Sequence, residues 1–412
     1  MDTCCLQTVE LLIEGVVYRG KGLARVDGMV CFVPGTLPGE TVRARIVERR
    51  RRYMAADLTQ VVSPSPARIS PACPLAFAPG IARPCPGCAY QHVAYSEELR
   101  LKQSQLTEML EHHAGVPATC FDNPVPSPAE TAYRNKIVLH EGNLGDCRVM
   151  GYVGADNRTI IDVESCPIAV NDINASLDAV RSGMGANAGT AGPRIRHTFR
   201  YTPHDGVVHF RGRADRRARW LTESTEAGEI RVPWGSFFQV NNAVTGKLMR
   251  CVLDLAAGGT TDRVVDLYCG VGLFAVGAAL AGAGEVLGID MDHDAVRAAK
   301  HNASNLAPGR RVFFLAAPAA AGLRRAMETA DPGSVTLIAD PPRGGLEKEV
   351  IDVIRRCPPA RLIYVSCAAD TLARDLGRLR EAKYAVRRAR LFDMFPRTAL
   401  FETVVELLHD AK

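Results

Sequence analysis

A cysteine in the C-terminal part of the chain lies where a nucleophile could act. Cys367 follows the apolar run 362–365, which predicts a buried strand, and precedes leucines at helical spacing that begin at Leu372. Asp370 is a residue type that caps helices, so we place Cys367 on a turn between a strand and a helix. Ligands bind at that edge of an open α/β sheet. A thiol there can be an activated nucleophile; the alternative is a small buried core residue.

Two carboxylates lie at the ends of other apolar runs: Asp340 follows one run, and Glu402 begins another. Asp340 lies in ADPPRGG (339–345), where Pro341 and Pro342 set a rigid loop against which a planar substrate could be held. Glu402 begins the last apolar run of the chain and, beside a nucleophile, is a candidate general base. Taken singly, Asp340 could end an ordinary strand and Glu402 could be a solvated acid.

A glycine loop indicates a nucleotide-like cofactor. The stretch 264–280 predicts a strand, a turn containing Gly270 and Gly272, and a helix of small residues. Asp290 ends the next predicted strand, where a carboxylate can bind ribose hydroxyls. This pattern is typical of dinucleotide-dependent enzymes and of enzymes that use S-adenosylmethionine (SAM), and it does not choose between them.

Four cysteines form a possible metal-binding set. Cys85 and Cys88 make a C-x-x-C flanked by prolines, Cys73 lies upstream, and Cys166 stands in a similar Cys-Pro setting. Four thiolates can hold a tetrahedral zinc ion or an iron–sulfur cluster, and spacing alone does not decide which. The alternative is a group of unrelated buried cysteines. The chain has 13 cysteines, an odd number, which in a reducing compartment favours metal ligands and catalytic thiols over disulfides.

The elements that must position these residues divide the chain into three predicted units. Residues 1–64 have short β-rich runs with closely spaced glycines, which predicts a small β-barrel. A basic ridge on this barrel suits RNA phosphates, with a neighbouring tyrosine that can stack a base; the alternative is an edge strand guarded by charge. The ridge consists of Arg43, Arg45, Arg49, Arg50, Arg51 and Arg52, with Tyr53 beside it.

The other two units are discontinuous. Residues 65–93 and 122–235 predict a β-rich central domain with one basic face. The arginines of that face are at positions 194, 196, 200, 211, 213, 216, 217 and 219. Residues 94–121, which include an amphipathic helix over 95–113, join residues 236–412, where alternating strands and helices predict a doubly wound α/β sheet.

The composition is that of an ordinary globular protein. The 412 residues are 47% hydrophobic and 23% charged, and no apolar run is as long as a membrane span. The N-terminus lacks a basic segment followed by an apolar core, so we expect a cytoplasmic protein that contacts no membrane. The net charge is +5 and the arginines cluster, which suits a polyanion or, alternatively, a solvated face.

These motifs together resemble those of uracil-C5 RNA methyltransferases, of the subgroup with an N-terminal TRAM domain and an iron–sulfur cluster. The resemblance rests on FFQVN (237–241), DLYCGVG (266–272), DPPR (340–343), VSCAADTLARDL (365–376) and FPRTALFE (395–402). It implies a class I SAM-methyltransferase fold with Cys367 as nucleophile and Glu402 as general base. It also implies that SAM and the target base are contacted by Gln239, Tyr268, Asp290 and Asp340, with Gly270 and Gly272 in the cofactor loop. A [4Fe–4S] cluster is implied on Cys73, Cys85, Cys88 and Cys166.

The chain departs from the family pattern in a few places. Eleven residues separate Cys73 from Cys85, more than is usual in relatives. Leu273 stands at a commonly polar position, and Leu400 stands where relatives often have histidine. The pair Ala368-Ala369 replaces a common Asn-Pro after the nucleophile.

The expected function is therefore SAM-dependent methylation of C5 of a uridine in RNA by a monomeric enzyme. Thiolate addition at C6 makes C5 nucleophilic, and a base must later remove the C5 proton. The resemblance favours 23S ribosomal RNA as substrate, with the T-loop of transfer RNA as the alternative. Two other classes stay open at this point: a non-catalytic RNA-binding or RNA-folding module, and an NAD-dependent oxidoreductase that uses the glycine loop.

Overall fold

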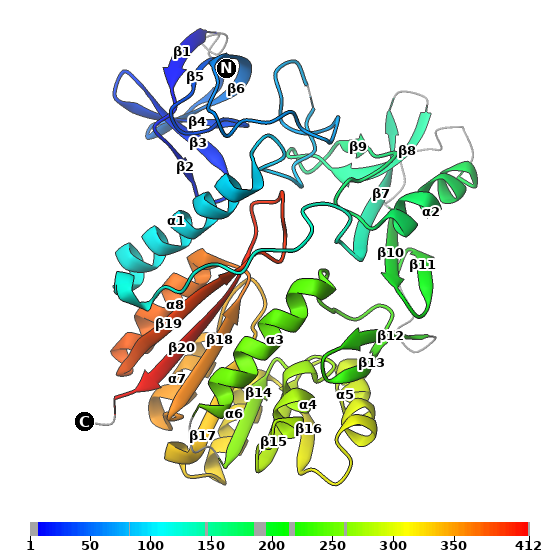
Figure 1. Ribbon diagram of the computed structural model, residues 1–412, viewed down its shortest axis with the longest axis vertical. Coiled ribbons are helices and arrows are strands. Elements are labelled where there is room, and N and C mark those ends of the chain that lie inside the picture. The colour runs from blue at the N-terminus through cyan, green and yellow to red at the C-terminus, as the bar shows by residue number, and fades with distance from the viewer. Residues whose placement is uncertain are drawn as a thin grey trace.

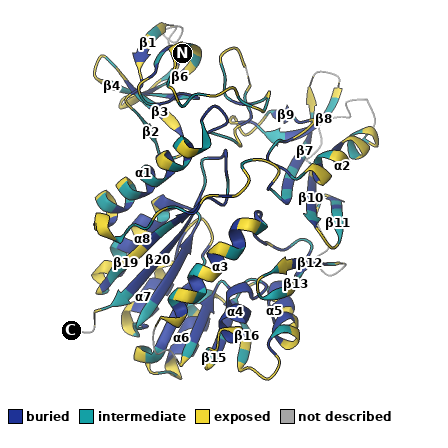
Figure 2. Cartoon of the chain, viewed as in Figure 1, coloured by how far each residue is buried: buried dark blue, intermediate teal, exposed yellow. Residues whose placement is uncertain are grey.

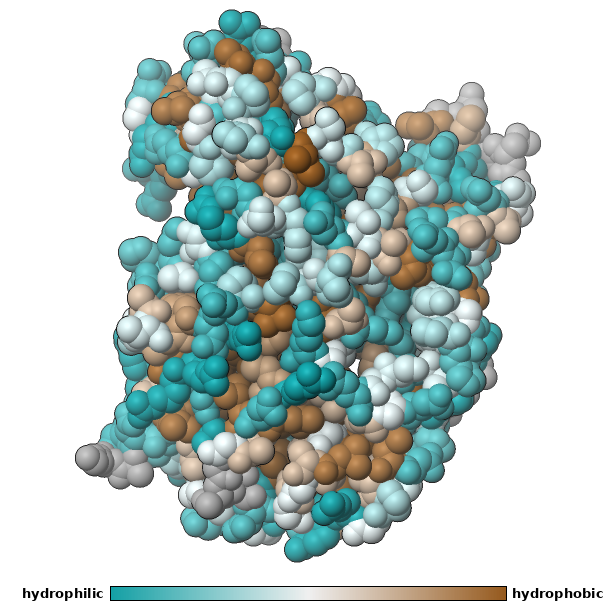
Figure 3. Space-filling model, in the orientation of Figure 1, coloured by the Kyte–Doolittle hydropathy of each residue, from teal (hydrophilic) through white to brown (hydrophobic). Residues whose placement is uncertain are grey.

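The computed structural model describes residues 7–81, 83–144, 147–184, 195–213, 219–258 and 262–410. A small N-terminal sheet, a central β-rich part and a large C-terminal sheet flanked by helices follow one another along the chain (Figure 1). Polar side chains cover much of the surface in the same orientation (Figure 3). Within the described ranges, no helix combines the length and the apolar character needed to cross a bilayer.

Six N-terminal strands curl around one apolar core. They are β1 (Thr8–Leu12), β2 (Gly15–Val17), β3 (Lys21–Val26), β4 (Met29–Pro34), β5 (Thr41–Arg49) and β6 (Tyr53–Ser63). Their order is β1-β5-β6-β4-β3-β2, and only the β4–β6 pair is parallel. In β5 the alternate residues Val42, Ala44 and Ile46 are buried, which turns Arg43 and Arg45 outward. The predicted all-β unit with surface arginines is confirmed.

The central part is a five-stranded antiparallel sheet with one helix against it. Its strands are β7 (Lys136–Leu144), β8 (Cys147–Val153), β9 (Ile160–Asp162), β10 (Arg196–Thr202) and β11 (Gly206–Arg211), in the order β11-β10-β7-β8-β9. Helix α2 (Asn171–Ser182) packs on β10 and β11. A separate hairpin, β12 (Trp220–Thr225) and β13 (Gly228–Pro233), packs instead on α5 (His293–Leu306) of the C-terminal part.

The arginines of the central part do not form one exposed basic face. Arg200 is fully buried, and its guanidinium donates to the Glu223 carboxylate at 2.7 Å. Arg211 is largely exposed, but it donates to Glu141 at 2.6 Å. The prediction is wrong for Arg200, because a buried acid on a neighbouring strand satisfies its charge. Exposed members are Arg196, Arg213 and Arg219, whereas Arg194, Arg216 and Arg217 lie outside the described residues.

The C-terminal part is a seven-stranded doubly wound sheet. Its strands are β14 (Arg263–Leu267), β15 (Glu285–Asp290), β16 (Val312–Ala316), β17 (Val335–Ala339), β18 (Arg361–Ser366), β19 (Tyr384–Phe392) and β20 (Glu402–His409). The order is β16-β15-β14-β17-β18-β20-β19, and β20 runs antiparallel to both of its neighbours. The first five strands are parallel, as the alternation of strands and helices predicts.

Helices cover both faces of this sheet. One apolar core joins residues such as Val264 and Ile363 to α3 (Asn242–Ala257), α4 (Leu273–Leu280) and α5. The other joins Val265 and Leu362 to α1 (Tyr95–Ala114), α6 (Ala319–Glu328), α7 (Lys348–Arg356) and α8 (Ala369–Glu381). Figure 2 shows the buried strands between helices whose outer sides are exposed. Alternate side chains along a strand therefore pack into two separate apolar cores, one on each face of the sheet.

A buried ion pair fastens α1 to the loop after β19. Lys102 has no exposed surface, and its Nζ donates to Glu98 at 2.7 Å and to Asp393 at 2.8 Å. Burial raises the pKa of Glu98 to about 7 despite the Lys102 charge. The loop that follows Asp393 leads to β20, so this pair ties α1 to the chain segment that carries Glu402.

We expect Lys102→Ala to lower the free energy of unfolding by about 3–5 kcal/mol, because it removes the charge that two buried acids share. Asp393 then loses its ion pair with Lys102, and Glu98 keeps the more distant Arg397, at 3.5 Å. The matched control is Arg100→Ala on the same helix, whose pair with Glu97 is largely exposed and should contribute less than about 1 kcal/mol. Urea denaturation of both variants measures the difference. Equal losses in the two variants would contradict the prediction.

Candidate active site

Cys367 lies on the predicted turn. Strand β18 ends at Ser366 and α8 begins at Ala369, which leaves the partly buried cysteine between them. The Ser366 hydroxyl accepts from the Ala368 backbone N–H at 3.2 Å and closes the turn. The predicted cap is wrong: Ala368 is the N-cap, without a side-chain hydrogen bond, and Asp370 lies in the first turn of α8.

Three strands bring the predicted reactive groups to one edge of the sheet. Asp340 directly follows β17, which pairs with β18, and Glu402 begins β20, the other neighbour of β18. Burial raises the pKa of the Cys367 thiol to about 11, and the charges of Glu402 and Asp340 act in the same direction. The structure thus brings the cysteine and both carboxylates close enough to share one electrostatic environment.

Burial raises the pKa of both carboxyl groups, although only Glu402 is buried throughout and Asp340 keeps some exposed surface. Burial raises the pKa of Asp340 to about 7. Burial, and then the Asp340 charge, raise the pKa of Glu402 well above its ordinary value. The Oε2 atom of Glu402 is buried and has no hydrogen-bond partner among the described residues. A buried carboxylate oxygen without a partner beside a thiol can accept a proton from a bound substrate.

Arg343 is a cation of this site that sequence reasoning missed. Its guanidinium lowers the pKa values of both Cys367 and Glu402, against the effect of burial, and it lines the same cavity as Cys367. Its loop is fastened to α8, because Thr371 Oγ1 donates to the Arg343 carbonyl at 3.1 Å. The signal was present in the motif DPPR, because its arginine directly follows the aspartate and prolines that predict a substrate-holding loop.

The glycine loop is shaped to let a ligand approach its backbone. Gly270 has φ +52°, and a Cβ there would meet nothing within 4 Å, so its side faces open space. Gly272 also has positive φ, and a Cβ there would lie 3.2 Å from the Phe314 ring. The Gly270 N–H donates to the Asp290 carboxylate at 2.9 Å, which holds the loop against the end of β15. Asp290 ends that strand as predicted.

Tyr268 and Gln239 are two further predicted cofactor residues. Tyr268 has φ +66°, a strained value for a bulky residue, and its hydroxyl donates to Glu347 at 2.8 Å. Gln239 is buried just before α3, and its carbonyl accepts from Asn135 at 3.2 Å. Asp266, which sequence reasoning did not single out, is fully buried and has one carboxyl oxygen without a partner among the described residues. Its other carboxyl oxygen accepts from the Ala275 N–H at 2.9 Å, so Asp266 ties the end of β14 to the first turn of α4.

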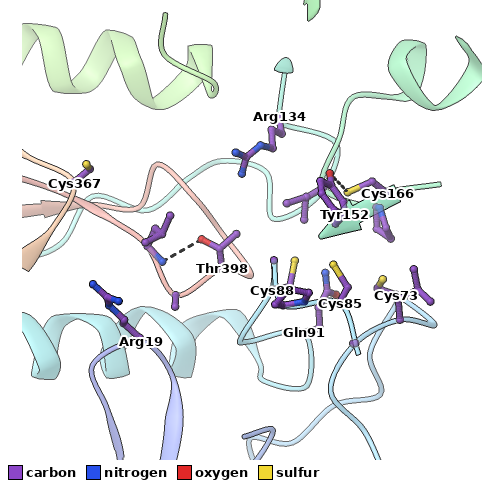
Figure 4. A pocket seen from close by; sticks show the side chains of 18 of the residues that line it. Arg19, Cys73, Cys85, Cys88, Gln91, Arg134, Tyr152, Cys166, Cys367 and Thr398 are labelled. Atoms are coloured by element: carbon purple, nitrogen blue, oxygen red, sulfur yellow. Dashed lines mark hydrogen bonds between the residues drawn. The ribbon is translucent and has the colours of Figure 1, made fainter. Parts of the chain in front are cut away.

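One cavity of about 510 Å³ joins the nucleophile to the four cysteines. Figure 4 shows the sulfurs of Cys73, Cys85, Cys88 and Cys166 gathered at one end, with Cys367 at the other. Arg343 also lines this cavity. The predicted SAM residues are not among the described residues that line this cavity.

The four cysteines form one group without satisfying single-ion geometry. Burial raises the pKa of Cys85 to about 11 and that of Cys88 to about 12, and nearby thiol charges act in the same direction. The Tyr152 hydroxyl donates to Cys166 Sγ at 3.5 Å. Within the described part of the chain, no three His, Cys, Asp or Glu side chains are placed to hold a metal ion. The cysteines therefore share one cavity without forming such a site there.

Comparison with known proteins identifies the family. Residues 225–410 match the family described as tRNA (Uracil-5-)-methyltransferase, and residues 4–59 match the TRAM domain. The 23S rRNA (uracil(1939)-C(5))-methyltransferase RlmD of Pseudomonas savastanoi pv. phaseolicola is 31% identical, over 96% of this chain and 92% of that protein. The chain belongs to the RNA uracil-C5 methyltransferase family. This confirms the resemblance to the methyltransferase family and the TRAM domain, and it excludes an NAD-dependent oxidoreductase. The iron–sulfur subgroup stays a prediction.

Further relatives agree with this assignment. The enzyme of the same name from Aeromonas hydrophila is 27% identical, over 97% of this chain and 96% of that protein. The solved structure of the Pyrococcus abyssi tRNA (uracil-54, C5)-methyltransferase, in complex with S-adenosyl-L-homocysteine, superposes with a TM-score of 0.71. That likeness covers 97% of this chain and all of the other at 23% identity, and it confirms the predicted fold.

Proposed function

We propose that this enzyme methylates C5 of a uridine in 23S ribosomal RNA, with SAM as methyl donor and Cys367 as covalent nucleophile. The observation that carries the proposal is the meeting of Cys367, Glu402 and Arg343 at one sheet edge, with the Glu402 Oε2 atom buried and unpartnered. Together these groups supply a nucleophile, a base and a cation.

The reaction follows from what each residue can do. The Cys367 thiol loses its proton as Sγ bonds to C6 of the uracil, and the C5–C6 electron pair becomes an enolate. SAM, when bound, supplies the methyl group that C5 takes up. The Glu402 carboxylate then removes the C5 proton, the C5–C6 double bond re-forms, and Sγ leaves. The net change replaces C5–H by C5–CH₃ and releases one proton.

Arg343 and Asp340 complete this arrangement. The Arg343 guanidinium opposes the effect of burial on Cys367 and favours the thiolate at the moment of attack. Burial raises the pKa of Asp340 to about 7. Its carboxyl group can therefore be protonated or ionised, and it can donate a hydrogen bond to the base or accept one from it. For SAM, the open space beside Gly270 lets the cofactor approach the backbone, and the Asp290 carboxylate fits the ribose hydroxyls.

The pKa values around the thiol predict a rate that rises with pH. The thiol must lose a proton and Glu402 must be ionised, and burial raises both pKa values. Both reactive forms therefore become more abundant as pH rises. We expect single-turnover methyl transfer to increase from about pH 6 to about pH 9, by about tenfold per unit where one ionisation limits the rate. RNA binding at each pH is the control, and a flat profile would contradict the assignment.

The TRAM ridge supports RNA as the substrate. Arg49, Arg51 and Arg52 are exposed at the β5–β6 connection, beside the exposed Tyr53. The other ridge arginines pair with acids: Arg43 with Glu10, Arg45 with Asp57 and Arg50 with Glu48. The ridge available to phosphates is therefore shorter than its sequence suggests, and it lies at one end of the hairpin.

The substrate is tested by a mass-spectrometric map of 5-methyluridine in ribosomal and transfer RNA, with and without the gene. Loss of one methyl group in 23S rRNA supports the proposal. Loss in the transfer RNA T-loop keeps the reaction and replaces the substrate. No loss in either RNA, together with no methyl transfer by the purified enzyme on transcribed RNA, favours a non-catalytic RNA-binding role.

We further propose that Cys73, Cys85, Cys88 and Cys166 hold a [4Fe–4S] cluster. Their common cavity supports this, because four thiolates that line one space can ligate the irons of one cluster. We expect anaerobically purified protein to contain iron and sulfide, both lost in Cys88→Ser and retained in Cys147→Ser, a change at an exposed cysteine. Zinc in place of iron and sulfide in the parent protein would contradict the cluster.

A further inference from the structure

The tip of the β2–β3 hairpin in the TRAM domain reaches the active-site cavity. Tyr18 and Arg19 form this tip, and both line the cavity with Cys367 and Arg343. Figure 4 shows Arg19 at the end of its hairpin, on the side of the cavity near Cys367. A domain expected to bind RNA at its arginine ridge thus has a second surface directed at the nucleophile.

Tyr18 supplies a cap that α8 lacks. The N-cap residue Ala368 makes no side-chain hydrogen bond, and the first N–H groups of a helix need acceptors. The Ala369 N–H donates to the Tyr18 hydroxyl at 3.1 Å. The Tyr18 ring is also fixed, since it meets the Phe401 ring edge-on at 6.1 Å between centroids. A side chain of another domain therefore caps the helix that begins two residues after the nucleophile.

The hairpin tip is held firmly enough to act as a support. A Cβ on Gly20 would lie 2.7 Å from Ala89 Cβ, so the tip packs closely on the segment after Cys88. Gln105 of α1 donates to the Val16 carbonyl at 3.2 Å. Arg19 forms an exposed ion pair with Asp370 at 3.1 Å, and exposed ion pairs contribute little stability. Tyr18 is therefore the main contact between the hairpin tip and α8.

The start of α8 also determines where the Arg343 loop lies. Arg374 donates to the Gly344 carbonyl at 2.7 Å, and Asp375 accepts from the Leu346 N–H at 2.8 Å. A shift of α8 would therefore move Arg343 together with Cys367. Small displacements of reacting groups are costly in catalysis.

We propose that Tyr18 is a positioning residue of the active site: its hydroxyl caps α8 and holds the turn that carries Cys367. The TRAM domain then completes the active site in addition to contacting RNA. This inference rests on the proposed function of Cys367 as nucleophile.

The test is Tyr18→Phe, which removes the hydroxyl and keeps the ring on Phe401. The matched control is Tyr384→Phe, which removes a hydroxyl bond of 2.7 Å to the Pro359 carbonyl at the other end of the same sheet. We expect kcat to fall about tenfold in Tyr18→Phe, with KM for RNA and Tm close to those of the control. Tyr384→Phe should keep the kcat of the parent enzyme.

A second readout needs no substrate. Site-resolved alkylation by iodoacetamide measures access to Cys367, with the exposed Cys147 as internal reference. We expect Tyr18→Phe to react about threefold faster at Cys367 alone, because the uncapped turn loosens. If either kcat or Cys367 alkylation in Tyr18→Phe equals that of Tyr384→Phe, the inference is overturned. If the parent enzyme methylates no uridine, the proposed function fails, and alkylation alone then decides the role of Tyr18.

Discussion

Replacing Cys367 with alanine is expected to abolish methyl transfer and to leave RNA affinity unchanged. Without Sγ no bond to C6 can form, and C5 is then too weak a nucleophile to take the methyl group. Loss of a covalent nucleophile lowers kcat by on the order of 10⁴-fold or more. Affinity should persist, because Cys367 carries no charge at rest: burial raises its pKa to about 11.

The measurement pairs methyl incorporation into transcribed RNA with an RNA-binding titration. Cys357→Ala is a matched control, since Cys357 follows α7, begins no helix, and does not line the active-site cavity. Parent-like methylation by Cys367→Ala would remove the covalent mechanism. Loss of activity in the Cys357 control as well would indicate a general effect of cysteine replacement instead of loss of the nucleophile.

Replacing Glu402 with glutamine is expected to trap the enzyme on its RNA. The amide cannot remove the C5 proton, so the methylated adduct accumulates and turnover falls by about 10²–10⁴-fold. Adduct formation should be at least as fast as in the parent, because the Glu402 charge that raises the Cys367 pKa is gone. The two half-reactions should therefore respond in opposite ways to one substitution.

Denaturing gels that resolve the protein–RNA adduct, followed over time, separate these steps. The control is Glu406→Gln, on the same strand, whose carboxylate pairs with Arg361 away from Cys367. We expect it to turn over without accumulating adduct, even if its stability falls. A Glu402→Gln enzyme that turns over normally, or that forms no adduct at all, would assign the base to another group.

The main parts of the site could be predicted from sequence because they are locally encoded. An apolar β-rich run, a turn residue and a helical leucine pattern place Cys367, whatever the rest of the chain does. The same holds for Asp290 at the end of β15 and for Glu402 at the start of β20. Parallel strands then bring such turns to one edge of the sheet. The roles assigned to these residues stay predictions until the variants are measured.

Contacts between distant segments were decided only by the tertiary structure. Asp370 has a capping side chain, but the cap of α8 comes from Tyr18, about 350 residues earlier in the chain. Arg200 looked like part of an RNA-binding face, and Glu223 buries it instead. No local pattern encodes either result, because both depend on which side chains the packing of separate domains leaves next to each other.

The cavity that contains Cys367 and the four cysteines also combines locally encoded features with contacts between distant segments. The strand–turn–helix units, the glycine loop and the alternating barrel strands could be predicted from sequence, since each depends on neighbours a few residues apart. The same holds for the C-x-x-C motif of Cys85 and Cys88. Only the tertiary structure joined the four cysteines to Cys367 in one cavity and set Arg343 beside the thiol. The physical reason is that burial and charge, which determine the pKa values at this site, come from the packing of all three parts of the chain.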